Sequence, residues 1–188
     1  MIRIALIGSI GAGKTFVSKC FKYPLFNADQ EVNKIYKKNK TCFQELKKKF
    51  PSKIKNFPIL KSELRNILTK SNIKVISKIV HPYVRKNLKD FLKKNSSKKY
   101  VILDIPLLIE NKLNKKSDIL IYVKTQKKII LKRLKKRGNY NKKIFKILED
   151  QQINKFKKIK LSNFIIDNSY NKKNIIKQVR KIKKYLND

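Results

Sequence analysis

The stretch LIGSIGAGKTFVSK, residues 6–19, constrains the fold of this chain more than any other. Gly8, Gly13, Lys14 and Thr15 fit the spacing G-x-x-x-x-G-K-[ST], with an apolar run before them and a helical pattern after them. Glycines let backbone N–H groups curl around phosphate oxygens, and the N-terminus of the following helix adds a partial positive charge. Three of the chain's four glycines fall in this stretch, which argues against a chance match. The sequence therefore predicts a phosphate-binding loop between a buried strand and a helix.

Short apolar runs alternate with helical patterns along the rest of the chain. Such alternation predicts the α/β class, here a three-layer P-loop fold with a mostly parallel five-stranded sheet flanked by helices. The expected strands are residues 2–7, a short one that begins near residue 23 and ends near residue 27, and residues 100–108, 118–124 and 163–168. The expected helices are residues 14–21, 30–49, 60–69, 73–94, 126–137 and 141–160, and one at the C-terminus. We expect His81-Pro82 to interrupt the fourth of these, because a residue before proline disfavours the α conformation.

The net charge of +38 is carried almost entirely by lysine, since only six of the 50 basic residues are arginines. Such charge attracts polyanions. However, the lysines are scattered among Ile and Asn with no basic tail, so genomic base bias is an alternative explanation and we expect no specific nucleic-acid partner. No apolar run is long enough to span a membrane, the N-terminus lacks a signal-peptide layout, and two distant cysteines predict no disulfide framework. We expect a cytoplasmic protein.

The residues beyond the phosphate loop narrow the kind of nucleotide-binding protein. The guanine-reading pattern NKxD is absent, since NKKSD at residues 114–118 has an extra residue. A short chain with its phosphate loop near the N-terminus favours a small-molecule kinase. In such an enzyme Lys14 reaches the β- and γ-phosphates of ATP, and the Thr15 hydroxyl binds Mg²⁺.

Seven stretches carry a more specific resemblance: LIGSIGAGKT, FNADQEVNKIY, LKSELRNIL, KIVHPYVRK, LDIPLLIENKL, ILKRLKKRG and IIDNSYN. In this order, and over nearly the whole chain, they resemble the dephospho-coenzyme A kinase family. The resemblance implies transfer of a phosphoryl group from ATP, with Mg²⁺, to the ribose 3′-hydroxyl of 3′-dephospho-CoA. It also implies a single domain of residues 1–188: a nucleotide-binding core (1–30, 98–126 and 161–188), a helical acceptor-binding region (31–97) and a lid (127–160). The part between Gln30 and Leu60 is shorter than is usual for the family.

Asp29 follows the second expected strand, where a carboxylate can accept the proton of an attacking hydroxyl. In the family this aspartate is the expected base; the alternative is an N-cap of the helix starting near Gln30. The family often has a second aspartate two residues earlier, but this chain has Asn27 there, which leaves Asp29 as the single candidate.

The remaining candidates follow from the resemblance. Arg65, His81, Arg85, Leu107 and Glu110 are expected on the acceptor side; the alternative for His81 is a polar residue that caps a kink. Asp104 closes a strand and either holds Mg²⁺ through water, together with Thr15, or caps the next turn.

Arg133 and Arg137 lie four residues apart and so share a helix face. In a lid they would place cationic groups on the transferring phosphoryl as catalytic residues beside Lys14; otherwise they form a solvated basic face. The donor ATP is expected on Gly8 and Gly11 to Phe16, including Ala12, with Gln152 and Asn168 near the adenine. The expected partners are small molecules only, and the protein is expected to act as a monomer. A nucleoside monophosphate kinase, a nucleic-acid-stimulated ATPase and a binder that has lost catalysis are the alternatives.

Overall fold

The computed structural model describes residues 1–69, 71–136, 142–169 and 171–187 and divides the chain into two compact units. Unit 1 comprises Met1–Asn27 and Asn95–Asp188, and unit 2 comprises Ala28–Lys94. Unit 2 begins directly after strand β2 (Leu25–Asn27) and ends before strand β3 (Tyr100–Asp104), so the whole unit is the connection between these two strands.

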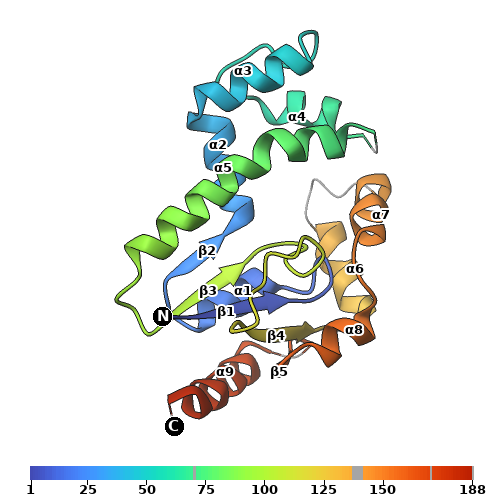
Figure 1. Ribbon diagram of the computed structural model, residues 1–188. Coiled ribbons are helices and arrows are strands. Elements are labelled where there is room, and N and C mark those ends of the chain that lie inside the picture. The colour runs from blue at the N-terminus through green and yellow to red at the C-terminus, as the bar shows by residue number, and fades with distance from the viewer. Residues whose placement is uncertain (70, 137–141, 170, 188) are drawn as a thin grey trace. The chain divides into compact units, whose positions relative to one another are not determined.

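Unit 1 is built on a five-stranded sheet (Figure 1). Its strands are β1 (Ile2–Ile7), β2 (Leu25–Asn27), β3 (Tyr100–Asp104), β4 (Ile119–Lys124) and β5 (Phe164–Asp167). The order is β2-β3-β1-β4-β5, and every neighbouring pair is parallel. Parallel strands place their carboxyl ends on one edge of the sheet. Asn27 at the end of β2 pairs in register with Asp104 at the end of β3, so both lie at the edge where the loop after β1 begins. The predicted α/β class with a five-stranded parallel sheet is confirmed.

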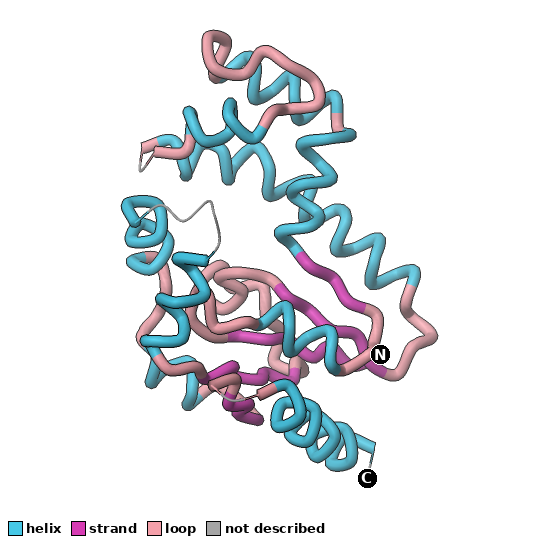
Figure 2. The backbone as a smooth tube through the Cα atoms, turned by 180° about the vertical axis from the view of Figure 1, so that it is seen from behind, coloured by secondary structure: helices cyan, strands magenta, loops and turns pink. Residues whose placement is uncertain are grey.

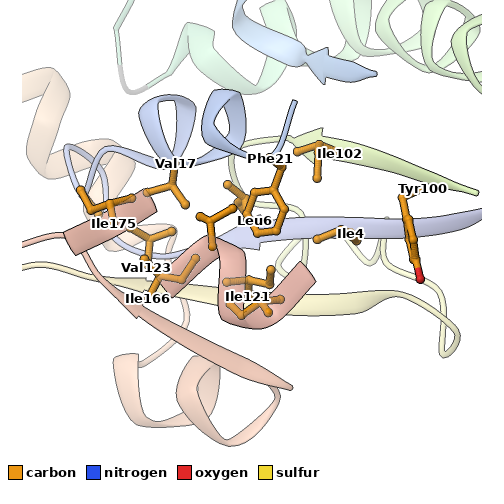
Figure 3. Close-up of a cluster of buried hydrophobic side chains, with 13 residues drawn as sticks. Ile4, Leu6, Val17, Phe21, Tyr100, Ile102, Ile121, Val123, Ile166 and Ile175 are labelled. Carbon is orange, nitrogen blue, oxygen red and sulfur yellow. The ribbon is translucent and has the colours of Figure 1, made fainter. Parts of the chain in front are cut away.

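The helices of unit 1 are α1 (Lys14–Cys20), α6 (Lys127–Lys136), α7 (Lys142–Asp150), α8 (Lys155–Lys160) and α9 (Lys172–Asn187). Alternate residues of β1 and β4 point to opposite sheet faces, as the two-residue strand period requires. Ile4, Leu6, Ile121 and Val123 form one core with Val17 and Phe21 of α1 and Ile175 of α9 (Figure 3). The intervening residues, including Ala5, Leu103 and Tyr122, are buried as well, so the sheet is covered on both faces.

Among the described residues of unit 2, the regular secondary structure is helical, and loops join the helices (Figure 2). It contains α2 (Ala28–Lys38), α3 (Lys40–Lys49), α4 (Lys61–Ile67) and α5 (Asn72–Lys94). Its own hydrophobic core includes Ile35, Leu46, Ile54, Ile67 and Ile76. A separate apolar core of this kind is what allows a segment to form a compact unit.

Two of the expected helices are each divided in the structure. The helix expected over 30–49 is two helices, because Asn39 is extended and its side chain accepts a hydrogen bond from Cys42 N at 2.8 Å, which makes it the N-cap of α3. The helix expected over 141–160 is likewise divided, and Asn154 caps α8 by accepting from Phe156 N at 2.7 Å.

The expected interruption at His81-Pro82 is wrong, since α5 continues through Pro82. A proline leaves the carbonyl four residues earlier without its helical donor. Here that residue is Lys78, and both Lys78 and Pro82 are exposed, so water can hydrate the carbonyl. Among the residues that the structure describes, no helix is long and apolar enough to cross a membrane.

Candidate active site

The loop between β1 and α1 has the backbone that a phosphate cradle requires. Gly8, Gly11 and Gly13 have φ values of 146°, 79° and 86°, which L side chains rarely adopt. A Cβ on Gly13 would lie 2.3 Å from Asn168 Nδ2, and one on Gly8 would lie 2.7 Å from the Val123 carbonyl oxygen. The loop therefore needs glycine both for its dihedral angles and for the close approach of neighbouring groups.

Lys14 begins α1, and its ammonium group turns back over the loop. Lys14 Nζ donates to the carbonyl oxygens of Gly8 at 3.0 Å and Ser9 at 3.2 Å. This holds a positive charge beside the backbone N–H groups of the loop, where it can complement a bound phosphate.

A polar cluster joins α1 to the carboxyl ends of β2 and β3. Thr15 Oγ1 donates to Asp104 Oδ2 at 2.5 Å, and Asn27 Nδ2 donates to the same oxygen at 2.6 Å. Asp104 is 3% exposed, so these two donors stabilise its buried carboxylate. Asp104 accepts hydrogen bonds from the phosphate-loop helix and from β2. It therefore does more than cap the turn that follows β3, which is the alternative role. The hydroxyl and carboxylate together offer the oxygen ligands that Mg²⁺ prefers.

The carbonyl oxygen of Ala12 receives hydrogen bonds from three separate elements. Asn168 Nδ2, Thr125 Oγ1 and Arg133 Nη1 lie 2.7, 2.9 and 3.3 Å from it. Arg133 Nη2 also donates to the Asn168 carbonyl oxygen at 3.0 Å, which ties α6 to the end of β5. These bonds fix the position of the Ala12 carbonyl at the end of the phosphate loop.

A cavity of about 490 Å³ adjoins this end of the loop. Its lining combines polar groups with apolar surface and contains Gly13, Phe16, Arg133, Lys136, Asn168, Lys172 and Ile175. The half-exposed ring of Phe16, the aliphatic side chain of Ile175 and the cations fit an aromatic base with a phosphate tail. The structure thus brings Phe16, Arg133 and Asn168 together around one cavity, but the half-buried Gln152 does not line it.

The segment after β3 holds two other predicted residues. The backbone of Leu107 has φ 55°, which is uncommon for residues other than glycine, asparagine and aspartate. Glu110 Oε1 lies 2.8 Å from Lys158 Nζ in an ion pair, and it also accepts from Ile153 N at 3.1 Å. Glu110 is therefore bound to the α7–α8 turn and to α8 within unit 1.

The other predicted residues lie on the helices of unit 2. Asp29 is exposed in the first turn of α2, which begins at Ala28, so the N-cap interpretation is wrong. Arg65 on α4 and Arg85 on α5 are exposed. His81 is half-buried on α5, and burial together with the positive charge of Arg85 lowers its pKa below the usual value. Arg137 lies outside the described residues.

These geometric features agree with comparisons to known proteins. Residues 2–174 match the family profile described as dephospho-CoA kinase. The chain belongs to this family. A dephospho-CoA kinase of Wolbachia pipientis wMel is 33% identical over 98% of this chain and 97% of its own length. One from Bartonella henselae is 34% identical over 94% of this chain and 93% of its own length.

Solved structures support the fold of the family. A crystal structure from Thermus thermophilus matches with a TM-score of 0.78 at 23% identity, covering 98% of this chain and 97% of that one. A dephospho-CoA kinase from Campylobacter jejuni matches with a TM-score of 0.66 at 22% identity, covering 98% of this chain and 96% of that one. The predicted family resemblance is confirmed by the family profile and the relatives.

Several residues of the site are not evident from the sequence. Asn27 stands out there only as a missing carboxylate, whereas in the structure it is a donor to Asp104. Thr125, Lys136, Lys172 and Ile175 are not among the predicted residues. Thr125 could have been found, because it directly follows β4 and so lies at the carboxyl edge of the sheet where ligands bind. The three cavity residues carry no such signal in a chain so rich in Lys and Ile.

Proposed function

We propose that this chain transfers the γ-phosphoryl group of ATP to the ribose 3′-hydroxyl of 3′-dephospho-CoA, giving CoA and ADP, the last step of coenzyme A biosynthesis. The observation that carries the proposal is the family match over residues 2–174, together with an intact phosphate loop in which Lys14, Thr15 and Asp104 are bonded as a kinase needs. Curated relatives with this name extend over nearly the full chain.

On the donor side, the loop N–H groups and Lys14 would hold the β- and γ-phosphates of ATP. The cavity beside Gly13 and Phe16 would take the adenosine, with Arg133 at the phosphate end. Lys14 and Arg133 then offset the charge that develops on the phosphoryl oxygens in the transition state. In this proposal Arg137 adds a second cation of the same kind.

Mg²⁺ fits the donor set of Thr15 Oγ1 and Asp104 Oδ2, since it is typically bound by one or two protein oxygens together with substrate phosphates. When bound, it would supply charge neutralisation at the phosphates. Asn27 keeps Asp104 oriented toward Thr15, because its amide donates to the oxygen that Thr15 also contacts.

On the acceptor side, Asp29 would accept the proton of the attacking 3′-hydroxyl and orient it in line with the γ-phosphorus. Chain connectivity sets Asp29 two residues after Asn27, whose side chain belongs to the Thr15–Asp104 cluster. Arg65, His81 and Arg85 supply the cationic or polar groups that an acceptor carrying phosphates requires. We place the reaction in the cytoplasm, where ATP is supplied, and propose a monomer because a net charge of +38 opposes self-association.

The test is a coupled assay of ADP release by the full chain with MgATP and a panel of acceptors. The panel contains 3′-dephospho-CoA, AMP, CMP, GMP, RNA, DNA and water alone. We expect dephospho-CoA to give the highest kcat/KM, and mass spectrometry with ³¹P NMR to show a new 3′-phosphomonoester. Faster reaction with a nucleoside monophosphate, or ATP hydrolysis stimulated only by nucleic acid, would replace the proposal with the corresponding alternative.

A further inference from the structure

The side chains of Glu110 and Lys158 form a buried ion pair that links the segment after β3 to α8. Glu110 Oε1 and Lys158 Nζ lie 2.8 Å apart, and the two side chains are 9% and 5% exposed. The same oxygen accepts from the backbone N–H of Ile153 at 3.1 Å. One carboxylate therefore fixes the α7–α8 turn and the following helix at once.

Burial gives this pair its strength. Both charges have lost hydration, and each compensates for the other in a medium of low dielectric constant. Removing one partner leaves the other as an uncompensated buried charge, so the arrangement resists displacement. The exposed pair of Lys124 and Asp167, 3.9 Å apart in the same unit, has no comparable constraint.

The segment that carries Glu110 is itself tightly held. It begins at Asp104, which accepts a hydrogen bond from Thr15 of the phosphate-loop helix. Ile105 and Leu108 are buried, and the turn is closed by Asn111 N donating to Leu107 O and Leu113 N donating to Leu108 O, each at 2.9 Å. A short, stiff connection therefore runs from the phosphate loop to Glu110.

The other end of α8 is tied to the phosphate loop independently, because the chain continues from α8 into β5, and Asn168, directly after β5, donates to the Ala12 carbonyl oxygen. Arg133 of α6 donates to the carbonyl oxygens of Ala12 and Asn168. The residues that follow α8 thus reach the loop itself, and α8 is held through Glu110, six residues beyond Asp104.

We propose that Glu110 is a positioning residue for the ATP side of the reaction, holding the α7–α8 turn and α8 on the segment that follows Asp104, through Ile153 and Lys158. This proposal rests on the proposed function and replaces the sequence-based expectation that Glu110 contacts the acceptor. The carboxylate acts on ATP only through the segment that it fixes, so it is not itself a catalytic residue.

The experiment compares full-length variants Glu110→Gln, Lys158→Met and the double variant, with Lys157→Met as control because Lys157 is the exposed neighbour on the same helix. Each single change should accelerate amide exchange at Ile153 and along α8 on the order of 10²-fold. It should also lower kcat/KM for ATP by roughly 10²-fold through misplacement of the segment, while KM for dephospho-CoA at saturating ATP stays within about twofold.

The double variant removes both charges and keeps a carbonyl that can accept from Ile153 N. It should recover most of the exchange protection and of kcat/KM for ATP, which also shows that the single variants did not fail merely by misfolding. Lys157→Met should match the wild type in all measurements.

Unchanged exchange in the single variants, or a double variant no better than either single one, would overturn the proposal. So would a defect confined to KM for dephospho-CoA, which would instead indicate direct acceptor contact. Amide exchange and calorimetric titration with MgATP need no acceptor, so they report on Glu110 even where the wild type fails to phosphorylate dephospho-CoA.

Discussion

The predicted site residues of unit 1 are held by hydrogen bonds between distant parts of the chain, whereas those of unit 2 lie on helix surfaces. Asn168 reaches Ala12 across 156 positions, and Thr15 reaches Asp104 across 89. In unit 2 the buried carboxylate of Glu63 accepts hydrogen bonds from Lys55, Asn56 and Leu60, all within eight positions of it. Asp29, Arg65 and Arg85 are exposed.

This difference indicates that the two sides of the proposed site are organised to different degrees before a ligand binds. The nucleotide side is organised before its ligand arrives, so little ordering remains to be done on binding. The acceptor side, as proposed, would rely on exposed charges, which solvent and salt screen until an acceptor excludes water. Substitutions in unit 1 should therefore affect folding and ATP binding together, and those at exposed positions of unit 2 should affect turnover alone.

The largest expected effect is that of Asp29→Asn. If Asp29 is the base, kcat should fall by roughly 10²- to 10⁴-fold, because an amide cannot take up the hydroxyl proton. KM for ATP and the thermal unfolding midpoint should stay unchanged, because the residue is exposed. Steady-state kinetics and calorimetry measure these quantities. Asp90→Asn, which removes an exposed carboxylate from α5, is the matched control, and near-normal turnover of Asp29→Asn would refute the assignment.

Gly13→Ala tests whether unit 1 couples stability to ATP binding. The new Cβ would need φ near 86° and would lie 2.3 Å from Asn168 Nδ2, so we expect the free energy of unfolding to fall by about 1–3 kcal/mol. Affinity for MgATP, measured by calorimetry, should fall as well. Adding Asn168→Ala removes the steric part and should restore stability only in part. A Gly13→Ala variant with normal stability and normal ATP binding would contradict the claim that substitutions in unit 1 affect folding and ATP binding together.

Glu63→Gln tests local bonding in unit 2. Burial raises the pKa of Glu63, but hydrogen bonds from Leu60, Lys55 and Asn56 outweigh it, and the net pKa is lowered. A lowered folded pKa gives stability that is present above the unfolded pKa, about 4.3, and is lost as pH falls through the folded value.

Urea unfolding of Glu63→Gln should therefore show a loss of about 1–3 kcal/mol at pH 7 and a smaller loss below pH 4. The activity per folded molecule at pH 7 should stay near that of the wild type. A variant as stable as the wild type at pH 7 would show that the hydrogen bonds to this carboxylate do not stabilise unit 2.

The smallest effect concerns the titration of His81, the only histidine in the chain. Since burial and the charge of Arg85 lower its pKa, Arg85→Gln should move its NMR titration midpoint upward. The exposed change Lys86→Gln should move it less, and addition of an anionic acceptor should raise it. Because the unfolded state binds this proton more tightly, His81 adds stability as pH rises between the two pKa values. A midpoint unaffected by Arg85→Gln would remove Arg85 as a cause.

The sheet and the phosphate loop could be predicted because their signals are local. Apolar runs such as IRIALI define buried strands, and the spacing of Gly8, Gly13 and Lys14 defines the loop. The helix break at Asn39 could not be predicted, because neither glycine nor proline marks it. An asparagine acts as an N-cap only when its side chain accepts a hydrogen bond from the backbone, as Asn39 does from Cys42 N.

The partners of the site residues could not be predicted, because they depend on tertiary packing. Arg3 has no role that the sequence suggests, yet it forms a buried ion pair with Asp118 at 2.6 Å across 115 positions. Glu110 and Lys158 are another such pair. In a chain with 50 basic residues, sequence spacing cannot single out the one lysine that a given carboxylate will meet.

One feature of the topology bears on how such enzymes diversify. The strands β2 and β3 are neighbours in the sheet, yet 72 residues, 28–99, separate their ends in the chain. The entropic cost of closing a loop grows only with the logarithm of its length, so adding or deleting a helical turn in this insert changes that cost by a fraction of a kcal/mol. The insert can therefore change size and surface while the pairing of β2 with β3 beside the phosphate loop is preserved.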